Sequence, residues 1–101
     1  MISTHVLNMA TGRPVPGVPV NLAVQHGETW EEIAETITDS DGRARNLGSA
    51  GMRPGIYRLT FDVNTTFYPR VEIIFSLTDS EALCHLPLLL SDYGYTTYRG
   101  S

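Results

Sequence analysis

Apolar and polar side chains alternate with a period of two in three separate segments of this chain. The segments are residues 18–24, 57–63 and 71–77, and in each of them every second residue is apolar. Successive side chains of a β-strand point to opposite faces, so this alternation predicts strands that each bury one face. Half-buried strands need a shared core, which predicts an all-β domain.

Turn-forming residues recur between these segments at short intervals. Gly, Pro or Asp-Gly signals occur at residues 12–17, 41–42, 54–55 and 69. Short strands separated in this way are typical of a β-sandwich or a β-barrel.

The segment around Trp30 fits two patterns. Its apolar residues also have helical spacing, because Trp30, Ile33 and Ile37 lie three or four positions apart. The segment leads directly into Asp41-Gly42, a turn signal that favours a hairpin, and we therefore predict a strand.

The segment 83–90 is apolar on both faces. A strand of this kind needs cover on both sides, and one sandwich supplies only one cover. We expect the second cover to come from another subunit. Pro87 has no N–H to donate, so the strand is expected to lie near an edge or to carry a bulge there.

Length and composition limit the classes of protein that need consideration. The chain has 101 residues, of which 42% are apolar and 18% charged, and this predicts a single globular domain over residues 1–101. The net charge is −4 and no basic run occurs, so neither nucleic acid nor an anionic membrane is an expected partner. Its one cysteine, Cys84, excludes an internal disulfide.

The first residues lack the basic and apolar regions of a secretory signal. We therefore expect a cytoplasmic protein. A peroxisomal location is the alternative if an N-terminal address precedes this sequence.

Three side chains with useful chemistry stand in or beside the predicted strands: His5, Arg43 and His85. Each alone is as readily explained as a structural histidine or a solvated charge. His5 and His85 could meet at a metal, but zinc sites usually have three or four protein ligands. Cys84 and His85 are neighbours on a strand and so point to opposite faces. We expect no metal and no cofactor. No Gly-x-Ser-x-Gly elbow is present to support a serine hydrolase.

Three ordered motifs give a more specific indication. Residues 85–91 read His-Leu-Pro-Leu-Leu-Leu-Ser, and residues 93–101 read Tyr-Gly-Tyr-Thr-Thr-Tyr-Arg-Gly-Ser. This ending resembles the closing signature of the 5-hydroxyisourate hydrolases of the transthyretin-like family. Residues 3–8 with 12–15, and residues 38–43, resemble the other two signatures of the same family, so the resemblance spans the whole chain.

The resemblance implies a fold, an assembly and a reaction. The implied fold is a prealbumin-like sandwich of two four-stranded sheets, and the implied assembly is a homotetramer built as a dimer of dimers. The implied reaction is hydrolysis of 5-hydroxyisourate to 2-oxo-4-hydroxy-4-carboxy-5-ureidoimidazoline in urate degradation.

The resemblance also implies the site, in a channel between the dimers. His5, Arg43, His85 and Ser101 are the expected catalytic residues. His5 and Arg43 are also expected to bind the substrate, with Tyr98, Arg99 and Gly100. Histidine suits proton transfer near neutral pH, and the Arg43 guanidinium suits carbonyl oxygens. The sequence does not say which histidine is the general base.

The chain departs from its relatives in three places: a shortened segment, Cys84 where relatives usually have a larger aromatic residue, and Asp92 where they often have proline. Between Asp62 and Tyr68, relatives carry a longer stretch with a short helix, so we predict a short turn and an all-β subunit here.

Two other functions fit parts of the pattern: a transthyretin-type carrier that binds small aromatic ligands without catalysis, and a β-sandwich interaction module.

Overall fold

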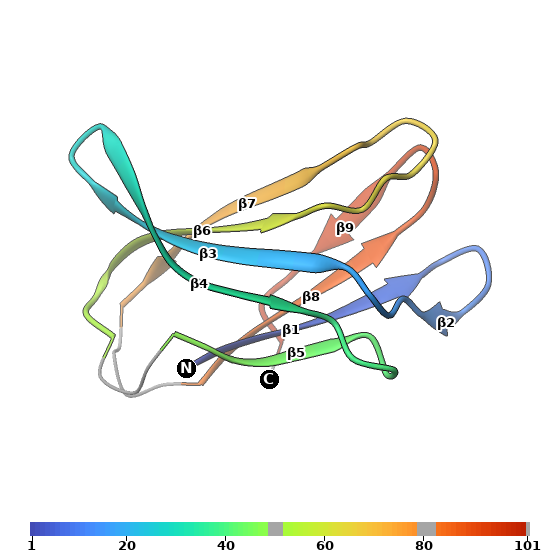
Figure 1. Cartoon of the computed structure of the whole chain (residues 1–101), viewed down its shortest axis with the longest axis horizontal. Helices are drawn as coiled ribbons and strands as arrows, with labels where there is room; N and C mark the ends of the chain where they lie inside the picture. Colours follow the sequence, from blue (N-terminus) through green and yellow to red (C-terminus); the bar gives the residue numbers. More distant parts are fainter. Residues whose placement is uncertain (49–51, 79–82, 101) are drawn as a thin grey trace.

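Within the described part of the chain, nine strands form two sheets that pack face to face (Figure 1). The computed structural model describes residues 1–48, 52–78 and 83–100. In chain order the strands are β1 (Ile2–Asn8), β2 (Arg13–Pro14), β3 (Pro19–His26), β4 (Thr29–Ile37), β5 (Arg43–Leu47), β6 (Gly55–Phe61), β7 (Val71–Leu77), β8 (Cys84–Leu90) and β9 (Tyr95–Thr97). The described residues include no helix that is long and apolar enough to cross a membrane.

The first sheet has the order β2-β1-β8-β9, with β5 also paired to β1, and the second has the order β4-β3-β6-β7. The predicted all-β sandwich is confirmed, but one sheet has five strands where four were expected. The reason is that a single edge of β1 is divided between two short strands. The two short strands, β2 and β5, approach each other at Val6 of β1. There, Val15 N–H donates to the Val6 carbonyl (2.9 Å), and Val6 N–H donates to the Gly42 carbonyl (2.8 Å).

The period-two segments supply the core, as predicted. The inward residues of β3, β6 and β7 are buried against those of β1 and β8. The largest fully buried side chains include Ile2, Leu22, Leu59, Phe61 and Leu88.

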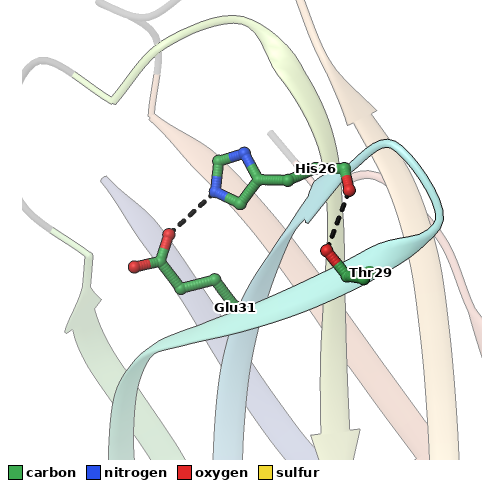
Figure 2. A network of polar contacts seen from close by, with 3 residues as sticks. All are labelled: His26, Thr29 and Glu31. Carbon is green, nitrogen blue, oxygen red and sulfur yellow. Dashed lines mark hydrogen bonds and ion pairs between the residues drawn. The ribbon is translucent and has the colours of Figure 1, made fainter.

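The segment around Trp30 is strand β4, so the predicted strand is confirmed, but the hairpin expected at Asp41-Gly42 is wrong, because that turn leads to β5 in the other sheet. Strand β4 instead forms a hairpin with β3. His26 pairs with Thr29, which leaves Gly27 and Glu28 as a two-residue turn, and Gly27 has a φ of 62°. Glycine adopts this left-handed conformation without steric cost. Figure 2 shows the two contacts that close the hairpin: Thr29 Oγ1 donates to the His26 carbonyl (2.9 Å), and His26 Nε2 lies 2.8 Å from Glu31 Oε1.

The connection between β6 and β7 is a short turn without a helix, as predicted. Asn64 has a φ of 50°, and Thr65 N–H donates to the Tyr68 carbonyl (2.9 Å). The turn lies against the β8–β9 connection, where Phe67 N–H donates to the Asp92 carbonyl (3.2 Å).

Strand β8 pairs on both sides, in parallel with β1 and antiparallel with β9. Its ladder to the C-terminal segment is interrupted at Pro87, because proline has no N–H to donate. Leu88 pairs with Thr97 before the interruption, and His85 pairs with Gly100 in the same register after it. Thr97 Oγ1 bridges the gap by donating to the Pro87 carbonyl (2.8 Å).

The turn that leads into β5 depends on Gly42. Its φ is 75°, and a Cβ atom there would lie 2.6 Å from the Val6 carbonyl oxygen. We expect Gly42→Ala to lower the free energy of unfolding by about 1–3 kcal/mol, measured by urea denaturation. Gly12→Ala is the matched control, because Gly12 also has a positive φ (71°) but open space around its Cα. Equal losses in the two variants would contradict the close contact at Gly42.

Candidate active site

Strand register brings His5, Arg43 and His85 to one face of the first sheet. His5 pairs with Arg43 across β1 and β5, and Ser3 pairs with His85 across β1 and β8. Residues 2, 4 and 6 of β1 are fully buried in the core, so residues 3 and 5 face outward. The three predicted side chains therefore come from three adjacent strands and share the outer face.

A cavity of about 190 Å³ opens on this face. Ser3, Arg43, Arg45 and His85 are among the residues that line it. The two guanidinium groups make it suited to a ligand that presents oxygen atoms with negative or partial negative charge.

His5 stabilises the turn that immediately precedes Arg43 in the chain. Its Nε2 lies 2.8 Å from the carbonyl oxygen of Asp41. A carbonyl oxygen only accepts hydrogen bonds, so Nε2 carries a proton and donates it. The Asp39 carboxylate fixes the same turn by accepting from the N–H groups of Arg43 (3.0 Å) and Asp41 (2.9 Å). The hydrogen bond from the Arg43 N–H lowers the pKa of Asp39, so this carboxylate stays ionised.

His85 is the histidine that lines the cavity. Burial lowers the pKa of His85, and the nearby charges of Arg43 and His5 lower it further, whereas a hydrogen bond with the backbone of Ser3 raises it. The net effect is a pKa below the usual value for histidine, so the His85 imidazole is neutral and able to accept a proton near pH 7.

The C-terminal segment closes over His85. Gly100 N–H donates to the His85 carbonyl (2.7 Å), and a Cβ atom on Gly100 would lie 2.7 Å from His85 Cδ2. Only glycine fits against the ring at this distance. Tyr98 lies two residues before Gly100 and is 54% exposed. Ser101, which we expected to be catalytic, lies outside the described residues.

Arg99 is separated from the other predicted site residues. It lines a different cavity, of about 160 Å³, together with Phe75, Cys84 and Leu86. Cys84 and Leu86 are buried on the core side of β8, opposite to His85. Within a single subunit, Arg99 therefore does not line the cavity that contains His85 and Arg43.

Ser3 is a residue of this site that the sequence did not indicate. Its Oγ lies 2.8 Å from His85 Nδ1. The period-two pattern places residue 3 on the same face as His5, but only the pairing of β1 with β8 brings it to His85.

Residues able to bind metal do not cluster in the part of the chain that the structure describes. No three His, Cys, Asp or Glu side chains gather there at a distance suited to one ion.

Comparison with known proteins assigns the chain to a family. The model of the HIUase/Transthyretin family matches residues 2–100. The chain belongs to this family.

Members of the family that are named as hydrolases align over almost the whole chain. A mouse 5-hydroxyisourate hydrolase is 38% identical and aligns with 99% of this chain and 94% of its own length. A 5-hydroxyisourate hydrolase from Caulobacter vibrioides is 37% identical, with coverage of 99% and 97%.

Solved structures include both branches of the HIUase/Transthyretin family. Klebsiella pneumoniae 5-hydroxyisourate hydrolase has a TM-score of 0.86 and 32% identity, covering 99% of this chain and 98% of its own. Sea bream transthyretin in complex with thyroxine has a TM-score of 0.90 and 26% identity, with coverage of 98% and 93%. The backbone alone does not separate enzyme from carrier, and the distinction depends on the side chains of the site.

Proposed function

We propose that this protein hydrolyses 5-hydroxyisourate to 2-oxo-4-hydroxy-4-carboxy-5-ureidoimidazoline, a step of urate degradation. The observation that supports this most directly is the meeting of His5, Arg43 and His85 on one sheet face. Relatives that are 37–38% identical over 99% of the chain carry the name 5-hydroxyisourate hydrolase.

The reaction adds water across an amide bond of the ring. The water oxygen bonds to the carbonyl carbon, the carbon–nitrogen bond breaks, and the nitrogen receives a proton. The side chains of the cavity can assist each of these events without a metal or cofactor.

His85 is the better candidate for the general base. His85 lines the cavity and its lowered pKa keeps it neutral, whereas His5 uses Nε2 to hold the Asp41 carbonyl. In this mechanism His85 takes a proton from water and returns it to the leaving nitrogen. Such positioned proton transfer contributes roughly 10²–10⁴ in rate.

Arg43 is the candidate for stabilising the oxyanion. It lines the same cavity as His85, and its planar guanidinium offers several N–H donors to the carbonyl oxygen as negative charge develops on it. His5 positions Arg43 through the Asp41 turn. Tyr98 and Gly100 bind the substrate in this proposal, and Arg99 does so from a second subunit, because within one subunit it lines a different cavity. The catalytic role expected for Ser101 stays a prediction.

The test is the ultraviolet decay of freshly prepared 5-hydroxyisourate, followed with and without the protein. We expect the protein to accelerate the decay in proportion to its concentration. The alternative is suggested by the similarity to transthyretin: a carrier would bind small aromatic ligands and leave the rate of decay unchanged. Unchanged decay would therefore reject the hydrolase.

We also propose that the subunits assemble as a homotetramer built as a dimer of dimers. Strands β7 and β9 are terminal in their sheets, and both stand at the same side of the sandwich (Figure 1). Two exposed aromatic side chains lie nearby: Phe67 is 64% exposed and Tyr93 is 72% exposed, with ring centroids 6.2 Å apart. The cavity of about 160 Å³ beside β7 and β8 is mostly apolar and could receive an aromatic ring from a second copy.

Phe67→Ala is expected to weaken this assembly. If the ring is buried by a second copy, its loss removes apolar contact area at about 25 cal/mol per Å². Gel filtration at decreasing protein concentration should show dissociation at higher concentrations than for the unmodified protein. The matched control is Ile33→Ala, which removes an exposed apolar side chain from β4. The same dissociation profile for all three proteins would contradict a role for Phe67 in assembly.

A further inference from the structure

We propose that Ser3 is a positioning residue that holds the His85 imidazole with its proton on Nδ1, so that Nε2 faces the reactant as the general base. This inference rests on the proposed function. It adds that Nε2 of His85 is the atom that accepts the proton, and that Ser3 is the residue that selects this nitrogen.

The contact between the two residues follows from the pairing of the first and last long strands. Ser3 and His85 are register partners across the parallel β1–β8 ladder, and their side chains share the outer face. Ser3 Oγ lies 2.8 Å from His85 Nδ1, and both residues are partly buried. Both also line the cavity that contains Arg43.

A second contact restricts the ring from another direction. Gly100 packs against Cδ2, and its N–H donates to the His85 carbonyl (2.7 Å). With Nδ1 engaged by Ser3 and Cδ2 covered by Gly100, the nitrogen left to meet a reacting group is Nε2. The two contacts therefore fix both the plane of the ring and the nitrogen that it presents.

The surroundings of His85 agree with a proton on Nδ1. A neutral imidazole has one donor nitrogen and one acceptor nitrogen, and a partner at one nitrogen decides the role of the other. A serine hydroxyl can accept a hydrogen bond as well as donate one, so Ser3 Oγ can accept from a protonated Nδ1 at the observed 2.8 Å.

The charged and titratable groups near the ring are Arg43 on β5 and His5 on β1, both of which lower the pKa of His85, and Arg45 lines the same cavity. Cys84 and Arg99 lie on the opposite side of β8. A serine is a suitable partner here because it orients the ring without the negative charge that would favour a protonated, inactive base.

The experiment compares the unmodified protein with Ser3→Ala, Ser3→Thr and a matched control, Ser91→Ala. Ser91 is also partly buried and its hydroxyl donates to the Gly94 carbonyl (3.0 Å), but it lies in the β8–β9 turn. Protein labelled with ¹⁵N-histidine reports which ring nitrogen of His85 carries the proton, and this measurement does not depend on activity. Initial rates with 5-hydroxyisourate give kcat and KM for the same samples.

We expect the unmodified protein, Ser3→Thr and Ser91→Ala to show His85 protonated on Nδ1, and Ser3→Ala to show a mixture of tautomers. We expect kcat to fall about tenfold in Ser3→Ala, as for the loss of one hydrogen bond, with KM nearly unchanged and activity retained in Ser3→Thr. Two results would overturn the inference: His85 protonated on Nε2 in the unmodified protein, or the same tautomer and kcat in Ser3→Ala as in the unmodified protein. Absence of hydrolysis by the unmodified protein would instead overturn the proposed function, because the tautomer is read separately.

Discussion

Replacement of His85 by Gln is expected to lower kcat for 5-hydroxyisourate by roughly 10²–10⁴, because glutamine cannot take a proton from water. His85 lines the cavity beside Arg43 and has a lowered pKa, so it is the group that can act as a base near neutral pH. The measurement is the initial rate of ultraviolet decay at saturating substrate. Circular dichroism should show an unchanged β-sheet spectrum.

The matched control for this variant is His26→Gln. His26 is an exposed histidine whose contact with Glu31 closes the β3–β4 hairpin (Figure 2). We expect its replacement to leave kcat unchanged. A kcat within twofold of the unmodified protein in His85→Gln would refute the assignment of the base.

Arg43→Gln is expected to lower kcat by about 10²–10³, the usual effect of removing one oxyanion donor. Arg43→Lys should recover only part of the loss, because an ammonium group cannot reproduce the planar fork of a guanidinium. The control is Arg53→Gln, since Arg53 is an exposed arginine that lines a different cavity. Full activity in Arg43→Gln would exclude a direct role for Arg43.

Arg43→Gln also has an expected effect on pH dependence. The Arg43 charge lowers the pKa of His85, so its removal should raise that pKa. A base works when it is deprotonated, so activity rises as the pH increases through its pKa. The acidic limb of kcat/KM should therefore lie below pH 6.5, the usual histidine value, in the unmodified protein and move to higher pH in Arg43→Gln.

Local sequence patterns predicted the parts of the fold that depend on neighbouring residues. The alternation in residues 18–24, 57–63 and 71–77 predicted strands β3, β6 and β7, because period two is a property of each strand by itself. The strand around Trp30 was predicted correctly, but the Asp-Gly signal on which that prediction depended does not form a hairpin, because β4 and β5 belong to different sheets. The division of one edge of β1 between β2 and β5 was not predictable in this way, because it depends on which strands meet.

The site could be predicted only in part, for the same reason: local patterns do not show which strands pair. The family resemblance indicated His5, Arg43 and His85, and the structure brings them to one face. Ser3 was missed because its importance comes from register with a residue at the other end of the chain. The placement of Arg99 on the opposite side of β8 follows from the register of the C-terminal segment, in which Gly100 pairs with His85, and the sequence does not reveal this pairing.

The parallel pairing of β1 with β8 has a consequence for how the chain acquires its site. The two partners of the Ser3–His85 contact are separated by 82 positions, so nearly the whole polypeptide must be synthesised before they can meet. Contacts of such high sequence separation form slowly, since the loop that they close must first lose its conformational freedom. On the ribosome, β1 therefore emerges long before its neighbour, and a nascent chain that stops short of β8 contains His5 and Arg43 but has no pocket.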